Sequence, residues 1–418
     1  MKGRRVYDKG IVIVGGGHGG SQAAASLREA GYEGHLTLLT EESELPYQRP
    51  PLSKAYLKDP AHELLPLRGA PFYEKNDVDL RLNSRVAAID PDAGALTLAG
   101  GSSLSADRII LATGSRARIP SVPGTDLDGL FTVRNAEDAR ALRDRLATAS
   151  DVVVVGGGFI GLEIAGTARQ LGKTVTVLEA ADRLMGRAVA PEISEHFLSL
   201  HRGWGADIRL RTPVGAFVGD NGALVAVETS EGQSLPADVA IIGIGAIPNT
   251  ELAEEAGIVC ENGILVNDFM ETSIPRVLAI GDAVTFDHGR YGRRLRLESV
   301  QNATDQARTA AHVLTGRREP YRDVPWFWSD QGDVKLQMVG LPFGASQSIV
   351  RGDREAGSFS VFHYDDDDLL AIDSVNRAGD HVVGRHLLGA GYPLPPAMAV
   401  DEDVNLKKYL KEQRAAHR

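Results

Sequence analysis

The chain has 418 residues, of which 43% are hydrophobic and 24% charged, and its formal net charge is −11. This length predicts two or three domains, and the acidic balance argues against general nucleic-acid binding, which needs a basic face. Cys260 is the only cysteine, so an intramolecular disulfide, a redox-active dithiol and a cysteine-rich metal site are excluded, and electrons must be carried by a bound cofactor.

The amino-terminal residues carry charge, but no apolar segment of a signal peptide follows them before the first glycine-rich turn. No run reaches the length of about 18 apolar residues that a membrane span needs. We therefore expect no membrane segment and a cytoplasmic location, and we predict no metal site.

The first predicted element is a continuous apolar run at residues 10–14, which is typical of a strand buried in a parallel sheet. It leads directly into a G-x-G-x-x-G turn and an alanine-rich helix, the arrangement that binds a dinucleotide. The glycines of this pattern are Gly15, Gly17 and Gly20. They allow a tight turn, close approach of a pyrophosphate, and packing of the helix on the strand. A second strand at 35–40 is followed by Glu41, whose carboxylate can accept hydrogen bonds from a ribose.

The same pattern recurs in the middle of the chain. An apolar strand at 151–155 runs into a second G-x-G-x-x-G turn, and after a helix the next strand, at 174–178, ends in Glu179. The glycines of this second pattern are Gly156, Gly158 and Gly161. Because each copy has strand, helix, second strand and terminal acid in order, the sequence predicts two bound dinucleotides.

Glu179 indicates which nucleotide the second copy takes. A carboxylate at this position pairs with the ribose 2′-hydroxyl and repels a 2′-phosphate, so NADH is favoured over NADPH. Arg183 and Arg187 follow closely and weaken that inference, because either could contact the pyrophosphate or lie on the surface.

Residues 107–114 look like the strand that closes an FAD domain, and residues 277–282 look like the return of the chain to it. Together with four further motifs they make nearly the whole chain resemble the putidaredoxin reductase-like family of bacterial FAD-dependent NADH:ferredoxin reductases, which serve oxygenases. The further motifs are LPYQRPPLSK at 45–54, IGAIPN at 244–249, ESVQNA at 298–303 and PWFWSDQ at 325–331.

The resemblance implies an α/β fold with two Rossmann-like dinucleotide-binding domains and a C-terminal α+β domain. The FAD domain is expected to be discontinuous, at 1–115 and 248–325, around an NAD domain at 116–247. The C-terminal domain is expected at 326–418.

The resemblance also implies two sets of cofactor contacts. The residues expected to contact FAD are Gly19, Glu41, Lys54, Val86, Thr113, Gly114, Arg134, Asp282 and Val300. The residues expected to contact NADH are Gly158, Ile160, Glu163, Glu179, Arg187 and Gly245. By strict strand count Thr40 corresponds to Glu179, but the family places its acid one step later, so the ribose role is assigned to Glu41.

The expected chemistry is the conversion of a hydride, which carries two electrons, into single electrons for a 2Fe–2S cluster, and a flavin can perform it. Lys54 is the candidate for stabilising charge beside the flavin. We hypothesise that Lys54 pairs with Glu163; the alternative is a surface lysine and a glutamate favoured only by the helix dipole. Trp326 and Trp328 share one face of a strand, and the resemblance favours Trp328 over Trp326 as the tryptophan beside the flavin, although both could simply pack in the core.

The predicted partner is an acidic 2Fe–2S ferredoxin, which feeds a cytochrome monooxygenase or a Rieske-type oxygenase. The resemblance places its docking at Arg308 and at the terminal lysines, Lys407, Lys408 and Lys411. A helix at about 300–314 is expected to direct its positive end at the flavin.

Three other functions are alternatives to this one. A disulfide reductase of the same architecture needs a cysteine near residues 44–54, and none is present. A flavin-dependent NADH oxidase or a reductase of a small molecule such as a quinone or monodehydroascorbate would turn over without a protein acceptor. A non-enzymatic, NAD-controlled interaction factor would show slow flavin reduction.

Overall fold

The computed structural model describes residues 9–417, and the chain divides into two compact units. The first unit contains the described residues up to Gln48, together with Leu64–Arg116 and Ile247–Pro325. The second contains Arg49–Glu63, Ala117–Ala246 and the described residues from Trp326 onward. The chain thus crosses between the units next to the predicted limits at 115 and 248. Residues 49–63 belong to the second unit, although the sequence placed them in the FAD domain, and the three-domain division stays a prediction.

A five-stranded parallel sheet forms the centre of the first unit. Its strands in spatial order are β19 (Val277–Ala279), β7 (Arg108–Leu111), β1 (Ile11–Val14), β2 (Leu36–Leu39) and β3 (Val78–Arg81). The side chains of β1 and β2 are all buried, as expected for short apolar strands covered on both faces.

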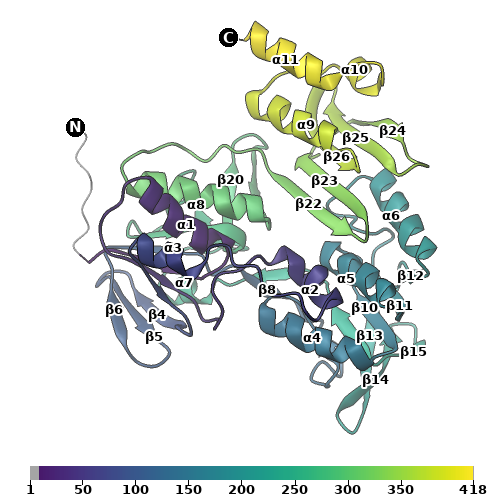
Figure 1. The fold of residues 1–418 in the computed structure, drawn as a ribbon, viewed down its shortest axis with the longest axis horizontal. Coiled ribbons are helices and arrows are strands. Elements are labelled where there is room, and N and C mark those ends of the chain that lie inside the picture. The colour runs from purple at the N-terminus through teal and green to yellow at the C-terminus, as the bar shows by residue number, and fades with distance from the viewer. Residues whose placement is uncertain (1–8, 418) are drawn as a thin grey trace. The chain divides into compact units, whose positions relative to one another are not determined.

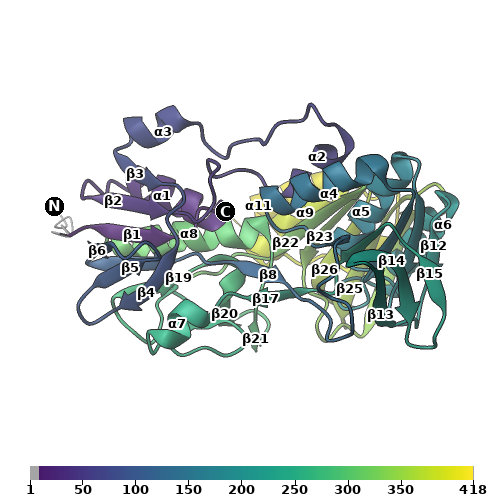
Figure 2. The ribbon, with the colours of Figure 1, turned by 90° about the horizontal axis from the view of Figure 1, so that it is seen from below.

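Helices α1 (His18–Glu29) and α8 (Val300–Leu314) pack against each other in this unit, and both views show them side by side (Figures 1 and 2). Alanines on both helices are buried, which allows the helices to approach closely. The remaining elements of the unit are α3 (Ala70–Lys75), α7 (Glu251–Glu255), β4 (Val86–Asp90), β5 (Ala95–Leu98), β6 (Ser103–Ser105), β18 (Ile264–Val266), η2 (Gly281–Ala283), β20 (Val284–His288) and β21 (Arg293–Leu295). Segments β8 (Ser115–Ala117) and β17 (Ala246–Pro248) carry the chain between the units.

A second five-stranded parallel sheet lies in the second unit. Its strands in spatial order are β12 (Asp207–Arg209), β11 (Thr174–Leu178), β10 (Asp151–Val155), β16 (Val239–Ile242) and β9 (Leu130–Phe131). The accompanying elements are η1 (Pro50–Ser53), α2 (Ala55–Lys58), α4 (Ala136–Thr148), α5 (Phe159–Gln170), α6 (Pro191–Gly203) and the antiparallel sheet of β13 (Val214–Asp220), β14 (Ala223–Thr229) and β15 (Ser234–Pro236).

The second unit also holds an antiparallel sheet, which α9 (Ala378–Ala390) covers (Figure 1). Its strands in spatial order are β22 (Trp326–Gln331), β23 (Val334–Gly340), β26 (Asp368–Val375), β25 (Ser358–Asp365) and β24 (Gln347–Asp353). Helices α10 (Pro396–Val400) and α11 (Leu406–Ala416) follow. Two parallel α/β sheets with an antiparallel C-terminal part confirm the predicted fold class.

No helix in the part of the chain that the structure describes is both long and apolar enough to cross a bilayer. Among residues 9–417, no group of three or more His, Cys, Asp and Glu side chains is arranged to hold a metal ion.

Candidate active site

The glycine-rich turn at residues 15–20, here called the first cradle, needs glycine for steric reasons. Gly15 has φ +114°, and a Cβ there would lie 2.2 Å from the carbonyl oxygen of Ala112. A Cβ on Gly20 would lie 1.8 Å from the carbonyl oxygen of Gly15. Gly17 is the N-cap residue of α1, and no side chain among the described residues caps this helix. The first N–H groups of α1 therefore suit a phosphate, and the cradle fits the FAD pyrophosphate.

Several predicted FAD contacts converge beside this cradle. A Cβ on Gly19 would lie 3.5 Å from Cδ1 of Ile280 and 3.6 Å from the carbonyl oxygen of Ala303. Ile280 directly precedes η2, which carries Asp282, and Ala303 belongs to the first turn of α8, which begins at Val300. The structure thus brings Gly19, Asp282 and the start of α8 together.

Thr113 and Gly114 lie on a turn that is tied to the returning chain. Thr113 Oγ1 donates to the carbonyl oxygen of Asn249 at 2.8 Å, and the N–H of Asn249 donates to the carbonyl oxygen of Gly114 at 2.9 Å. The next residue, Ser115, donates from Oγ to Oδ2 of Asp282 at 3.4 Å. This turn therefore holds the Asp282 carboxylate, as an anchor for a ribityl hydroxyl would require.

The strand end beside the first cradle is occupied by a threonine. A Cβ on Gly16 would lie 2.6 Å from Cβ of Thr40, whose Oγ1 accepts a hydrogen bond from the N–H of Glu42 at 3.3 Å. Glu41 is exposed, one residue further along the chain. Val86 begins β4 and packs against the core of the first unit. The FAD contacts of Glu41 and Val86 stay predictions.

The turn at residues 156–161, here called the second cradle, repeats this geometry. Gly156 has φ +109°, and a Cβ on Gly161 would lie 2.2 Å from the carbonyl oxygen of Gly156. The space beside Gly158 is open, since the nearest atom to a Cβ there is the carbonyl oxygen of Gly243 at 3.8 Å. The side chain of Ile160 is 44% exposed in the first turn of α5 and offers an apolar surface. This cradle therefore also fits the pyrophosphate of a dinucleotide.

Glu179 is fixed at the wall of the second cradle. Its Oε2 accepts from the N–H of Gly157 at 2.6 Å, and its Oε1 accepts from the N–H of Ala181 at 2.7 Å. Nearby, Nη2 of Arg187 lies 3.6 Å from the position of a Cβ on Gly245, which has φ +115°. The structure therefore brings Arg187 and Gly245 together, as expected for two residues that contact one ligand.

Arg134 immediately precedes the N-cap residue of α4. Its N–H donates to Oδ2 of Asp138 at 2.8 Å, and its carbonyl oxygen accepts from Nη1 of Arg49 at 2.6 Å. The backbone of Arg134 is thus held in place, while the predicted contact of its side chain with FAD stays a prediction.

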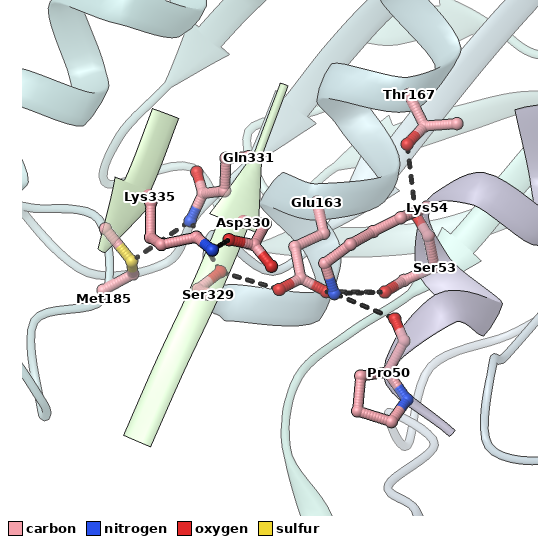
Figure 3. A network of polar contacts seen from close by, with 10 residues as sticks. All are labelled: Pro50, Ser53, Lys54, Glu163, Thr167, Met185, Ser329, Asp330, Gln331 and Lys335. Carbon is pink, nitrogen blue, oxygen red and sulfur yellow. Dashed lines mark hydrogen bonds and ion pairs between the residues drawn. The ribbon is translucent and has the colours of Figure 1, made fainter. Parts of the chain in front are cut away.

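Lys54 and Glu163 form the predicted pair (Figure 3). Nζ of Lys54 lies 2.7 Å from Oε2 of Glu163 and also donates to the carbonyl oxygen of Pro50 at 2.9 Å. The same Oε2 accepts from Oγ of Ser53 at 2.5 Å, whereas Oε1 accepts from Oγ of Ser329 at 2.7 Å. The side chain of Glu163 is only 3% exposed. A carboxylate buried to this degree needs paired donors, and three are present.

Trp326 and Trp328 share one face of β22, as predicted, with ring centroids 5.5 Å apart and planes tilted by 32°. The guanidinium of Arg385 lies 4.3 Å from the ring centroid of Trp326, and the ring of His381 lies 5.6 Å away. Burial, together with the charge of Arg385, lowers the pKa of His381 to about 4, so this histidine is neutral at physiological pH. The role of Trp328 beside the flavin stays a prediction.

Comparison with known proteins identifies the family. A family model described as pyridine nucleotide-disulphide oxidoreductase matches residues 9–307. The chain belongs to this family. A second model, described as reductase C-terminal, matches residues 326–410 of the oxidoreductase.

Individual relatives of this oxidoreductase are ferredoxin reductases or similar enzymes. It is 42% identical over 409 residues to rhodocoxin reductase of Rhodococcus erythropolis, which corresponds to 98% of this chain and 96% of that protein. It resembles the crystal structure of a ferredoxin reductase from Rhodopseudomonas palustris at 43% identity, with a TM-score of 0.94 over 96% of this chain and 100% of that one. It also resembles putidaredoxin reductase in its covalent complex with putidaredoxin, at 39% identity and a TM-score of 0.93 over 97% and 99% of the two chains. The predicted resemblance to bacterial ferredoxin reductases is confirmed.

This oxidoreductase lacks the dithiol that the family name implies, since Cys260 is its only cysteine. The thiol packs partly buried against the core of the first unit. Burial, helped by the charge of Glu254, raises the pKa of Cys260 to about 11, so the thiol is protonated at neutral pH. Electron transfer by the oxidoreductase therefore depends on bound cofactors.

Sequence reasoning missed three side chains around Glu163, namely Ser53, Ser329 and Gln331. Ser53 lies next to Lys54 in the motif at 45–54, in which the resemblance assigns a role to the lysine alone. Ser329 and Gln331 alternate with the two tryptophans along β22, so the period of two places them on its opposite face. That face packs against α5, where the ring centroid of Phe327 lies 4.7 Å from that of Phe159. The alternation is therefore a signal that Ser329 and Gln331 share a face, but it does not show that α5 covers this face.

Proposed function

We propose that this oxidoreductase takes a hydride from NADH and passes electrons one at a time to a 2Fe–2S ferredoxin that serves an oxygenase. The observation that carries the proposal is the presence of two complete glycine cradles in a chain whose one thiol has a raised pKa. Bound FAD supplies the conversion between two-electron and one-electron transfer. The relatives support the acceptor, because one of them was solved in complex with putidaredoxin.

The two cradles are assigned to different nucleotides by their surroundings. Asp282 and the N-terminus of α8 lie beside the first cradle. The carboxylate suits the ribityl chain, and the positive end of the helix suits an electron-rich flavin edge. α5, which starts at the second cradle, carries Glu163 in its second turn. In this assignment the first cradle binds FAD and the second binds NADH, and Glu163 faces the nicotinamide end.

Lys54 and Glu163 act together in this proposal. The carboxylate holds the ammonium at 2.7 Å, and the backbone oxygen of Pro50 fixes its other side. A positioned ammonium stabilises negative charge that arrives with the hydride, and it costs little reorganisation because its partners already hold it. Trp328 is proposed to lie beside the flavin on the side where the ferredoxin approaches.

NADH is proposed as the preferred reductant. Glu179 accepts two backbone hydrogen bonds, which orient its carboxylate in the cradle. Arg183, which could have bound a 2′-phosphate, instead donates to the carbonyl oxygen of Val189 and to Oγ of Ser194. A 2′-phosphate would therefore meet a carboxylate at this wall without Arg183 to neutralise it.

Docking of the acidic ferredoxin at Arg308 and at the terminal lysines stays a proposal. Arg308 forms an ion pair with Asp305 in α8, which reduces its net attraction for a partner. Lys408 lies 3.9 Å from Glu412, within one turn of α11. We also propose a cytoplasmic location, because the reaction consumes NADH and the single cysteine excludes the intramolecular disulfides common in exported proteins.

Anaerobic titration of the purified yellow protein with NADH, followed by addition of a 2Fe–2S ferredoxin and cytochrome c, tests the proposal. Flavin should bleach with one equivalent of NADH, and cytochrome c should be reduced rapidly only when ferredoxin is present. A protein without flavin would overturn the proposal. Rapid turnover with oxygen or a quinone, unaffected by ferredoxin, would instead favour the alternative, a flavin-dependent NADH oxidase or small-molecule reductase.

A further inference from the structure

Ser329 connects the C-terminal sheet to the buried carboxylate of the dinucleotide-binding helix. Its side chain is fully buried in β22, and its Oγ lies 2.7 Å from Oε1 of Glu163 in α5 (Figure 3). Lys54 and Ser53 both bond to the other carboxylate oxygen. Ser329 is therefore the partner that holds Oε1 among the described residues.

The donor and acceptor of each hydrogen bond can be assigned by starting at the Glu163 carboxylate. An ionised carboxylate only accepts, so the single hydroxyl proton of Ser329 points at Glu163. The contact of Ser329 with Gln331, at 3.3 Å, must then be donated by Nε2 of Gln331. The same Nε2 lies 3.6 Å from Sδ of Met185, a weak acceptor that takes its other proton. Gln331 consequently presents its carbonyl oxygen to His201.

His201 ends this chain of donors. Its Nε2 lies 2.8 Å from Oε1 of Gln331 and must donate, while its buried Nδ1 has no hydrogen-bond partner among the described residues. Both facts describe a neutral imidazole protonated at Nε2. Burial lowers the pKa of His201, and this effect is larger than the opposite effect of the hydrogen bond to Gln331. The lowered pKa agrees with a neutral imidazole.

We propose that Ser329 is a positioning residue for hydride transfer, held in a one-way series of donors from His201 through Gln331 to Glu163. The inference rests on the proposed function, because it assigns Glu163 to the nicotinamide end. With Oε1 fixed by Ser329, the carboxylate plane is set and Oε2 stays directed at Lys54. Without that bond the carboxylate can turn about its last side-chain torsion, and the ammonium loses its fixed position, which hydride transfer needs.

The series uses side chains from three elements of the second unit. His201 comes from α6, Glu163 from α5, and Ser329 and Gln331 from β22. Both residues of β22 are fully buried, so the series is shielded from water. The C-terminal sheet thus contributes directly to the geometry of the nicotinamide-facing carboxylate.

The test compares Ser329→Ala with Ser329→Thr and with a matched control, Ser360→Ala. Ser360 is equally buried in the same sheet and also bonds to a carboxylate, Oδ2 of Asp380 at 3.0 Å. Flavin content and thermal melting establish that each variant folds and holds FAD. The rate of flavin reduction by NADH is then measured by anaerobic stopped flow as a function of NADH concentration.

Ser329→Ala should reduce flavin about tenfold more slowly than the parent, with NADH affinity changed less than about twofold. Ser329→Thr should restore the rate, and Ser360→Ala should keep the parental rate. Gln331→Met, which leaves the hydroxyl in place, should slow reduction less than Ser329→Ala.

Equal rates of flavin reduction for Ser329→Ala and Ser360→Ala would overturn the inference. A larger effect of Gln331→Met than of Ser329→Ala would contradict the proposed direction of the series. If NADH does not reduce the parent protein, the proposed function is wrong. If NADH reduces the parent protein and the Ser329→Ala variant equally fast, only the inference about Ser329 is wrong.

Discussion

The two glycine cradles have nearly the same backbone, but the helix and the strand that follow them carry different side chains at two corresponding positions. Their first glycines have φ +114° and +109°, and helices α1 and α5 have twelve residues each. Two residues after the last glycine, the first cradle has Gln22 and the second has Glu163. At the end of the following strand, the first has Thr40 and the second has Glu179. The glycine pattern is thus shared, whereas at these two positions the second copy has acids and the first has Gln22 and Thr40.

These differences decide what each helix contacts. Gln22 donates to Oγ of Ser26 in its own helix at 2.9 Å and accepts from Arg68 at 3.2 Å. Glu163 instead accepts hydrogen bonds from Lys54 and from a strand of the C-terminal sheet. The glycines therefore determine where a pyrophosphate lies, whereas residues outside the glycine pattern, such as Glu163 and Glu179, determine the chemistry.

The largest effects are expected from the third glycine of each cradle. Gly20→Ala would place a methyl group 1.8 Å from a carbonyl oxygen and should yield protein without flavin. Gly161→Ala should retain flavin but bind NADH about a hundredfold more weakly, equivalent to about 3 kcal/mol of strain. Absorbance at the flavin band and NADH titration measure both. Gly203→Ala, where the space is open, is the control. Loss of flavin only in Gly161→Ala would reverse the assignment of the cradles.

Glu163→Gln makes the second helix match the first at this position. Flavin reduction by NADH, followed by anaerobic stopped flow, should slow about a hundredfold because the amide carries no charge to hold the ammonium. Lys54→Met should have a similar effect, and the double variant should be no slower than either single variant, since the two side chains act as one unit. An unchanged rate in Lys54→Met would remove this lysine from the mechanism.

Glu179→Thr makes the strand ends of the two cradles alike. The ratio of kcat/KM for NADH to that for NADPH should fall about tenfold, because the carboxylate that repels a 2′-phosphate is gone. Steady-state kinetics with both nucleotides measure the ratio. Thr40→Val, in the first cradle, should leave it unchanged. If the ratio is the same in Glu179→Thr, nucleotide choice is made elsewhere.

The smallest effects concern surface charge in the two units. Replacing Lys407 and Lys411 by Gln should raise the KM for ferredoxin about threefold at low ionic strength and have no effect at high salt. Arg308→Gln should have a weaker effect, because Asp305 already pairs with this guanidinium. Lys75→Gln is the control on an exposed helix. Turnover that is indifferent to salt in the parent protein would reject electrostatic docking.

Much of the fold could be predicted from local patterns. The strands predicted at 151–155 and 174–178 and the helix predicted at 300–314 have the observed limits, because apolar runs and the capping residue Ser299 determine them locally. The grouping of residues 49–63 with the second unit could not be predicted. It depends on tertiary contacts such as that of Arg143, in α4, whose guanidinium lies 4.5 Å from the ring centroid of Tyr56.

The candidate site was predictable only in part. The glycines follow from backbone geometry alone, whereas the pairing of Lys54 with Glu163, 109 residues apart, came from the family resemblance. The series from His201 to Ser329 was missed because the alternation along β22 shows which side chains share a face, but not which helix covers that face. Thr40, in contrast, was predictable from the sequence alone. Counting along the strand places it at the position of Glu179, and it does lie beside the first cradle.

The lone cysteine has a practical consequence for spectroscopy. Because burial raises the pKa of Cys260 to about 11, its thiol is protonated at pH 7, and maleimide and iodoacetamide reagents should label it slowly. A new cysteine on an exposed helix would then react selectively without prior removal of the native one. Fluorescent or spin labels could in this way report distances between the two units during turnover in the otherwise unmodified protein.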